Sequence, residues 1–380
     1  MQHIYLDHAA ATPVDERVVS AMSPYLTEHF YNPSALYSAA QDVRKAVEEA
    51  RSVVAGVLST RPAEIVFTAG ATEGNNMAIH GVMTQYHDAQ VAVSGLEHDS
   101  VLAAAERHSS GIIPVTEDGI VTPEAVRATV TDKTVLVSVM YANNEVGTIQ
   151  PIRRIGQMLA EIRAERRKAG NSMPLYFHTD AAQAANYLDL QVSRLGVDLL
   201  TLNGGKIYGP KQSGVLYVRG GVTLKPLIVG GGQEAGLRSG TENVPAIIGL
   251  AQALQIASQM RMAETNRLQA LQRHVFSRLA DSLPDLIVTG SQKHRLPNNI
   301  HLIMPGRDNE RLLFELDGRG IMAAAGSACS ASSDLPSHVL KAMGYTDEYA
   351  RSSLRLTTGR STDQAAVDTL IAALIELARS

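Results

Sequence analysis

The 380 residues carry a formal net charge of -4 and 45% are hydrophobic, a balance that suits a large domain with a smaller one and gives no reason to expect nucleic-acid binding. No apolar run reaches the roughly 18 residues that span a bilayer, and the opening MQHIYLDH lacks the basic and apolar segments of a secretion signal. We therefore expect a cytoplasmic protein without direct contact to membranes or nucleic acid.

Two helical patterns come first, at residues 15–30 and 39–58. Short apolar runs then alternate with helical patterns, among them a long amphipathic one at 152–169; the runs are EIVFT, QVAVSG, IIPV, TVLVSVM, LYFHT, DLLTLN and SGVLYVRG. Alternation of this kind is typical of a mostly parallel sheet that helices cover on both faces.

A long helical pattern at 245–283 separates this region from a second, smaller alternation of strands and helices. We therefore predict an α/β fold with two domains. The large domain, residues 15–250, holds a mostly parallel seven-stranded sheet flanked by helices. The smaller α+β domain combines residues 1–14 with residues 251–380.

An acid and a lysine stand at the ends of two neighbouring runs. Asp180 follows LYFHT, and Lys206 follows DLLTLNGG. Ligands of parallel sheets bind at the carboxyl ends of the strands. An acid there can keep the pyridine nitrogen of pyridoxal phosphate protonated, and a lysine amine can bond covalently to the aldehyde carbon. Asp and Lys at strand ends are, however, more often solvated surface groups.

The segment EIVFTAGATEGNN places a strand, a turn of small residues and a helix start in sequence. Backbone N–H groups and the helix dipole favour an anion at such a point, and Thr72 adds a hydroxyl. The pattern indicates a phosphate site, although an ordinary turn with Thr72 as the helix cap fits equally well.

Two further polar residues follow strands. His98 comes after QVAVSGLE and is a candidate for proton transfer, since an imidazole has a suitable pKa. Most lone histidines are structural, and this chain has 12. Asn144 comes after TVLVSVMYAN, where an ordinary turn also suits the Asn-Asn pair.

The single cysteine, Cys329, excludes an internal disulfide and any multi-cysteine metal site. A free cysteine is usually a small buried hydrophobe, but the neighbours in GSACSASSD are small and polar, which favours a mobile, exposed loop. Arg355, in SSLRLTTGR, is expected at the end of a strand, and its guanidinium can grip a carboxylate at two points.

Several motifs together resemble one enzyme family. YLDHAAATPVD, HTDAAQ, GGKIYGPK, GGGQEAGLRSGTEN, GSACSAS and SSLRLTTGR stand in the order and at the spacing of the NifS/IscS-type cysteine desulfurases, which are class V aminotransferases of pyridoxal phosphate fold type I. The resemblance extends over nearly the whole chain. It implies pyridoxal 5'-phosphate as the cofactor and an obligate homodimer.

The resemblance also implies residue roles. Residues that match family contacts to the cofactor are Ala71, Thr72, His98, Asn144, Asp180, Gln183, Asn203, Gly205, Lys206 and Thr241. Among these, His98 would stack on the ring and move protons, Gln183 would bond the ring hydroxyl oxygen, and Thr241 would reach the phosphate of the neighbouring subunit. Arg355 and Asn144 would hold the carboxylate of the substrate.

The activity implied is the conversion of L-cysteine to L-alanine, with Lys206 and His98 handling protons and Cys329 accepting the sulfur as a persulfide. An acceptor protein then receives the sulfur: an iron–sulfur cluster assembly scaffold, a tRNA-thiolation carrier or a DNA-modifying system. No metal is needed. Two alternatives stay open, namely a pyridoxal phosphate lyase or aminotransferase that does not use the cysteine, and a non-catalytic dimeric scaffold.

Three positions depart from the family pattern. Asn203 and Gly205 stand where a serine and a histidine commonly help to bind the phosphate, and Ala235 stands where an arginine is common. The amide of Asn203 can still donate a hydrogen bond, and the backbone N–H of Gly205 can approach a phosphate closely because no side chain obstructs it. We therefore expect the cofactor to be retained.

Overall fold

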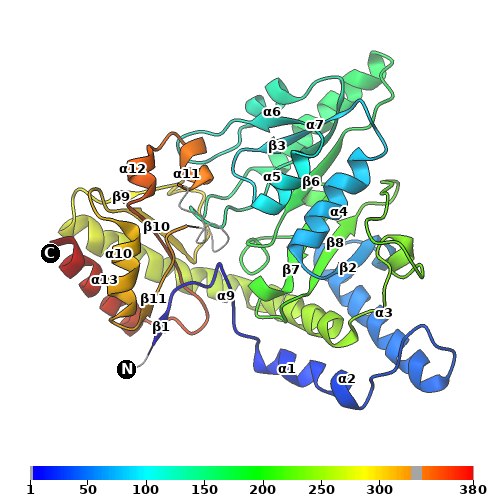
Figure 1. Cartoon of the computed structure of the whole chain (residues 1–380), viewed down its shortest axis with the longest axis horizontal. Helices are drawn as coiled ribbons and strands as arrows, with labels where there is room; N and C mark the ends of the chain where they lie inside the picture. The colour runs from blue at the N-terminus through cyan, green and yellow to red at the C-terminus, as the bar shows by residue number, and fades with distance from the viewer. Residues whose placement is uncertain (1–2, 327–335, 380) are drawn as a thin grey trace.

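The computed structural model describes residues 3–326 and 336–379 and is built around a seven-stranded sheet (Figure 1). Its strand order is β2-β8-β7-β6-β5-β3-β4. Strand β8 runs opposite to the other six, which all run in the same direction. The strands are β2 Ile65–Thr68, β3 Gln90–Ser94, β4 Ser109–Ile113, β5 Thr134–Ser138, β6 Tyr176–Asp180, β7 Leu199–Asn203 and β8 Gly214–Val218. The predicted α/β class is confirmed.

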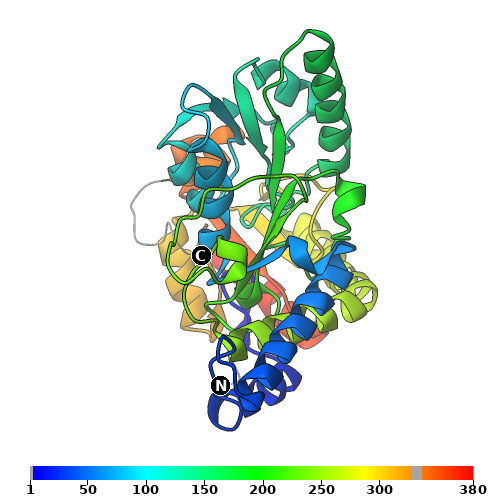
Figure 2. The ribbon, with the colours of Figure 1, turned by 90° about the vertical axis from the view of Figure 1, so that its right-hand side faces the viewer.

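Helices cover both faces of this sheet because successive strand residues point to opposite sides, as Figure 2 shows from the side. Leu136 and Leu199 pack with α4 and α5, whereas Val137 and Leu200 pack with the helices of the other face. The helices are α3 Ser38–Leu58, α4 Ala71–Met83, α5 Asp99–Ala105, α6 Pro123–Thr129, α7 Ile152–Lys168 and α8 Val192–Leu195.

A second core lies around a three-stranded antiparallel sheet of order β12-β10-β9 and a parallel pair, β1 with β11. Its strands are β1 Ile4–Tyr5, β9 Ile287–Val288, β10 Asn299–Ile303, β11 Ile321–Met322 and β12 Ser353–Thr357. The accompanying helices are α10 Asn309–Asp317, α11 His338–Ala342, α12 Asp347–Ala350 and α13 Gln364–Arg379.

One helix, α9 Val244–Ser282, connects the two cores (Figure 1). Its apolar residues up to Ile256 pack into the large core, and those from Leu268 onward pack into the small one. The packing therefore changes from one core to the other along a single helix. The division into domains at residues 250 and 251 stays a prediction.

The helix expected at residues 15–30 is two short helices, α1 Glu16–Met22 and α2 Pro24–Thr27. Pro24 lacks the N–H that a continuous helix would use, so the chain begins a new helix there. The short 3₁₀ turns are η1 Pro62–Glu64, η2 Gly204–Lys206 and η3 Glu234–Gly236. In the described ranges, no helix has both the length and the apolar character needed to cross a membrane.

Candidate active site

The carboxyl ends of β6 and β7 meet at one edge of the sheet. These strands pair in parallel, with Asp180, the last residue of β6, opposite Thr201. Lys206 ends the 3₁₀ turn that follows β7. Both residues line a cavity of about 200 Å³ together with Ala9, Ala10, Ala71, Thr72, His98, Ser100, Met140, Ala142, Asn144, Ala182, Gln183, Asn203 and Arg355.

The Asp180 carboxylate is held by two N–H donors. Nδ2 of Asn75 donates to Oδ2 over 2.7 Å, and the backbone N–H of Ala182 donates to Oδ1 over 2.9 Å. The carboxyl group of Glu97 is fully buried nearby, and burial, followed by the charge of Asp180, raises the pKa of Glu97 well above its usual value. Burial therefore favours the neutral form of the Glu97 carboxyl group.

His98 precedes α5 and caps this helix. Its Nδ1 accepts the backbone N–H of Ser100 over 3.1 Å and lies 2.9 Å from the hydroxyl of the same residue. Because a backbone N–H can only donate, Nδ1 is the acceptor, and the proton of the neutral imidazole resides on Nε2. The cap thus fixes both the orientation of the ring at the cavity and its tautomer.

The predicted phosphate region is the start of α4. Gly70 has a φ of 137°, a conformation that glycine adopts readily, and the helix begins directly after it at Ala71. The first N–H groups of a helix have no partner within it, and Ala71 and Thr72 place this end at the cavity. Strand, turn and helix start therefore lie as the sequence predicted.

Asn203 and Gly205 contact each other. The N–H of Gly205 donates to Oδ1 of Asn203 over 2.9 Å, and Gly205 is buried rather than among the residues that line the cavity. This N–H is therefore already used by Asn203. The amide nitrogen of Asn203, with its two N–H donors, is the better candidate to contact a phosphate.

The chain segment 7–12 crosses the cavity and contacts the predicted site residues. Nζ of Lys206 donates to the carbonyl of Ala10 over 2.5 Å, and Nε2 of Gln183 donates to the carbonyl of Ala9 over 3.0 Å. Lys211, by contrast, donates to the carbonyl of Thr12 and does not line the cavity. The two lysines of the GGKIYGPK motif thus differ in their access to the site.

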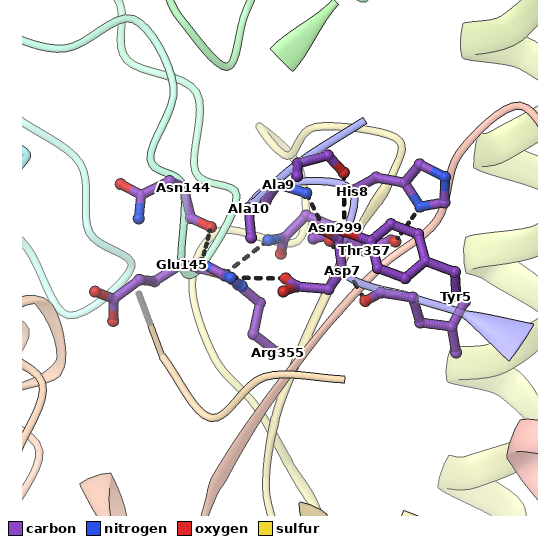
Figure 3. A network of polar contacts seen from close by, with 12 residues as sticks. Tyr5, Asp7, His8, Ala9, Ala10, Asn144, Glu145, Asn299, Arg355 and Thr357 are labelled. Carbon is purple, nitrogen blue, oxygen red and sulfur yellow. Dashed lines mark hydrogen bonds and ion pairs between the residues drawn. The ribbon is translucent and has the colours of Figure 1, made fainter. Parts of the chain in front are cut away.

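Arg355 lies in the middle of β12, not at the end of a strand as the sequence suggested. Its side chain is 1% exposed and reaches the cavity. Nη2 donates to Oδ1 of Asp7 over 2.8 Å, Nη1 donates to the carbonyl of Asn144 over 3.3 Å, and Nε has no hydrogen-bond partner among the described residues (Figure 3). The arginine retains donors for a further acceptor.

Besides Gly205, one described residue that the sequence predicted for the site does not line this cavity. Thr241 is exposed and lines a different cavity, of about 250 Å³, with residues of the glycine-rich segment before α9. Cys329 lies outside the described residues. Where the described chain enters and leaves that stretch, Ala324 exchanges two backbone hydrogen bonds with Arg355, and Ser337 donates to Oε2 of Glu145 over 2.5 Å.

A family model described as Aminotransferase class-V matches residues 4–370 of the chain. The chain belongs to the class V aminotransferase family. Membership in this family implies pyridoxal phosphate as the cofactor, as the resemblance predicted.

Other class V relatives are similar over nearly the full length. The chain is 40% identical over 377 residues to "Cysteine desulfurase IscS 1" of Archaeoglobus fulgidus, covering 97% of this chain and 95% of the relative. A solved structure titled "NIFS-LIKE PROTEIN" aligns with a TM-score of 0.90 at 30% identity and covers 99% of both chains. A second, "SspA in complex with cysteine", aligns with a TM-score of 0.80 at 32% identity over 93% of this chain and 98% of its own.

The cavity of this class V protein fits pyridoxal phosphate by the chemistry of its donors. The carboxylate of Asp180 would suit the ring nitrogen, the amine of Lys206 would suit the aldehyde carbon, and the helix start with Thr72 would suit the phosphate. Gln183 and His98 also border it. When bound, the cofactor supplies an electron sink for a bond at the α-carbon of an amino acid.

Sequence reasoning missed two residues of this site. Asn75 is fully buried on α4 and holds Asp180, although it lies 105 positions before it in the chain. Asn75 follows Thr72 by three positions, so the two residues lie on the same face of the helix. This spacing is the sequence signal that could have indicated Asn75. Asp7 contacts Arg355 across 348 positions, and no local pattern predicts such a pair.

Replacement of Asn203 by alanine tests the phosphate region. If the amide donates to the phosphate, Asn203→Ala removes one charged hydrogen bond and raises the dissociation constant of pyridoxal phosphate about tenfold. The constant is measured by equilibrium dialysis of the reconstituted protein. Asn171→Ala, whose amide contacts the carbonyl of Asp132 elsewhere, is the matched control. Equal affinity of Asn203→Ala and the parent for pyridoxal phosphate would show that Asn203 does not help to bind the phosphate.

Proposed function

We propose that the protein is a cysteine desulfurase, which converts L-cysteine to L-alanine and transfers the sulfur to Cys329 as a persulfide. The observation that carries this proposal is the cavity itself, where Asp180, Lys206 and Arg355 meet from two different sheets. Full-length similarity to proteins named cysteine desulfurases supports it. We further propose that the protein acts in the cytoplasm and passes the sulfur to an acceptor protein.

In this proposal, Arg355 and Asn144 bind the carboxylate of L-cysteine, which places the amino group toward Lys206. Lys206 then accepts and returns a proton at the α-carbon through Nζ, and His98, whose Nε2 carries the proton, first donates one and then takes one back. The C–S bond of the substrate breaks while a bond forms between its sulfur and the thiolate of Cys329. The electron pair of the C–S bond stays on the β-carbon, which takes up a proton to give alanine.

The proposed role of Cys329 is supported by contacts of described residues on either side of it. Ala324 pairs through its backbone with Arg355, and His338 lies 3.0 Å from the carbonyl of Glu97 through Nε2. Both partners belong to strands or loops that also carry residues of the cavity. The described residues before and after the stretch with Cys329 therefore contact elements that carry residues of the proposed active site.

Lys206 is expected to bond covalently to the cofactor, because it lines the cavity and Lys211 does not. Borohydride reduction of the loaded protein, followed by peptide mapping, should place the pyridoxyl group on Lys206. Lys206→Ala should lose the label, whereas Lys211→Ala should keep it. A pyridoxyl group on Lys211 in the parent protein would contradict the assignment of Lys206.

Cys329 is expected to accept sulfur without a part in cofactor binding. Cys329→Ser should keep the yellow colour of bound pyridoxal phosphate and change its absorption on addition of L-cysteine, yet form no protein persulfide. Mass spectrometry of the intact protein after a short exposure to L-cysteine measures the persulfide. Undiminished sulfur addition in the variant would contradict the proposal, since the chain has no other cysteine.

We also propose a homodimer that shares its sites, with Thr241 reaching the partner's phosphate. Three consecutive apolar residues before the glycine-rich segment are exposed, namely Leu227 at 41%, Ile228 at 42% and Val229 at 77%. Exposed apolar residues that cluster in this way can mark a protein interface. Thr241 lies exposed in the same region of the chain, at a cavity that also includes Arg238.

Sedimentation equilibrium should give twice the chain mass of 40.7 kDa. Thr241→Ala should weaken pyridoxal phosphate binding about tenfold through the loss of one charged hydrogen bond, while the dimer persists. Thr223→Ala, an exposed threonine outside that cavity, should bind the cofactor like the parent. A monomer at micromolar concentration, or unchanged affinity in Thr241→Ala, would refute the shared site.

A further inference from the structure

The carboxylate of Asp7 is the charged partner of Arg355 in this structure. Figure 3 shows it facing the guanidinium, with the carbonyl of Asn144 on another side. The ion pair is 2.8 Å long, and the two side chains are 20% and 1% exposed. Among the described residues, Asp7 is thus the one acid that forms an ion pair with buried Arg355, and it comes from the opposite end of the chain.

The backbone around Asp7 is fixed against β12. The N–H of Thr357 donates to the carbonyl of Leu6 over 2.7 Å, and the N–H of His8 donates to the carbonyl of Thr357 over 3.3 Å. Arg355 lies two residues before Thr357 and therefore shares its face of the strand. In addition, the Tyr5 hydroxyl donates to the carbonyl of Asp7 over 2.9 Å. Asp7 has little freedom to move away from Arg355.

Asp7 occupies only part of the guanidinium. An arginine has five N–H donors, and the described contacts use Nη2 for Asp7 and Nη1 for Asn144, while Nε is buried without a partner. A carboxylate that enters the cavity can therefore bind the remaining donors without displacing Asp7. Planar guanidinium groups bind carboxylates at two points only in particular orientations, so the orientation of Arg355 decides how the ligand lies.

We propose that Asp7 is a positioning residue, which holds the guanidinium of Arg355 in the orientation that receives the carboxylate of an α-amino acid. This inference rests on the proposed function for the identity of Arg355 as the carboxylate site. The next residues of the segment contact Gln183 and Lys206 through the carbonyls of Ala9 and Ala10. The same short segment therefore positions both the carboxylate site and the lysine.

Two effects of opposite sign follow from the loss of Asp7. Its negative charge repels a ligand carboxylate, so removal of the charge favours binding. Its hydrogen bond orders the long side chain of Arg355. Without Asp7, the free-energy cost of ordering that side chain falls on ligand binding and weakens it. The second effect is the larger one here. Without Asp7, the 3.3 Å contact to Asn144 is the one side-chain hydrogen bond that Arg355 keeps to the described residues, and water near the partly exposed Asp7 carboxylate weakens its repulsion.

The test compares L-alanine with ethylamine, which differs from it by the carboxylate alone. Both are titrated into the pyridoxal-phosphate-loaded protein, and binding is followed by the absorption of the cofactor. Asp7→Ala should bind L-alanine about tenfold more weakly, as expected for the cost of ordering one long side chain, and ethylamine unchanged. Asp7→Asn, which keeps an acceptor for Nη2, should retain most of the affinity for L-alanine. In an Arg355→Ala background, Asp7→Ala should add nothing.

Asp15→Ala is the matched control, because Asp15 also pairs with an arginine, Arg360, but does not line the cavity. It should bind both ligands like the parent. Equal weakening of both ligands in Asp7→Ala would indicate general damage and overturn the proposal, as would unchanged or tighter binding of L-alanine. Neither ligand contains sulfur, so these outcomes are independent of whether the protein desulfurates cysteine.

Discussion

The segment 7–12 is the constraint on which the site depends, because it joins the small sheet to the large one. On one side, the N–H of Ala9 donates to Oγ1 of Thr357 over 2.9 Å. On the other side, both the N–H and the hydroxyl of Thr12 donate to the carbonyl of Gly205, next to Lys206. Arg355 lies between Leu354 and Leu356 of one hydrophobic core, whereas Lys206 adjoins Ile207 of another. The segment 7–12 keeps the two residues within reach of one ligand.

The charges at the cavity are held by pairing and burial. Burial of an arginine is costly unless its donors are paired, and Asp7 pairs with buried Arg355. Burial also raises the pKa of a second acid, Glu97, which favours its neutral form. The cavity therefore presents a defined pattern: a negative group at Asp180 and donors at Arg355 and at the start of α4. This pattern suits a zwitterionic ligand that is bound beside an anionic cofactor.

The sequence predicted the parts of the site that local pattern controls. Asp180 and Lys206 follow buried parallel strands, and the rule that ligands bind at strand ends placed them together. The helix start at Ala71 was visible as a strand followed by small residues. Asp7, by contrast, meets Arg355 through a contact 348 positions long, and no periodicity carries such information. The boundary at Pro24 was missed because the apolar pattern continues through it.

The proposed activity is tested most directly by the products formed from L-cysteine. The loaded protein is incubated with L-cysteine and an excess of a small thiol, which releases the transferred sulfur as sulfide, and alanine, sulfide and pyruvate are quantified together. The account predicts one alanine for each sulfide and no pyruvate, because the β-carbon is protonated and the amino group stays on the product. Pyruvate formation in step with sulfide, or no turnover by a protein that carries its cofactor, would contradict it.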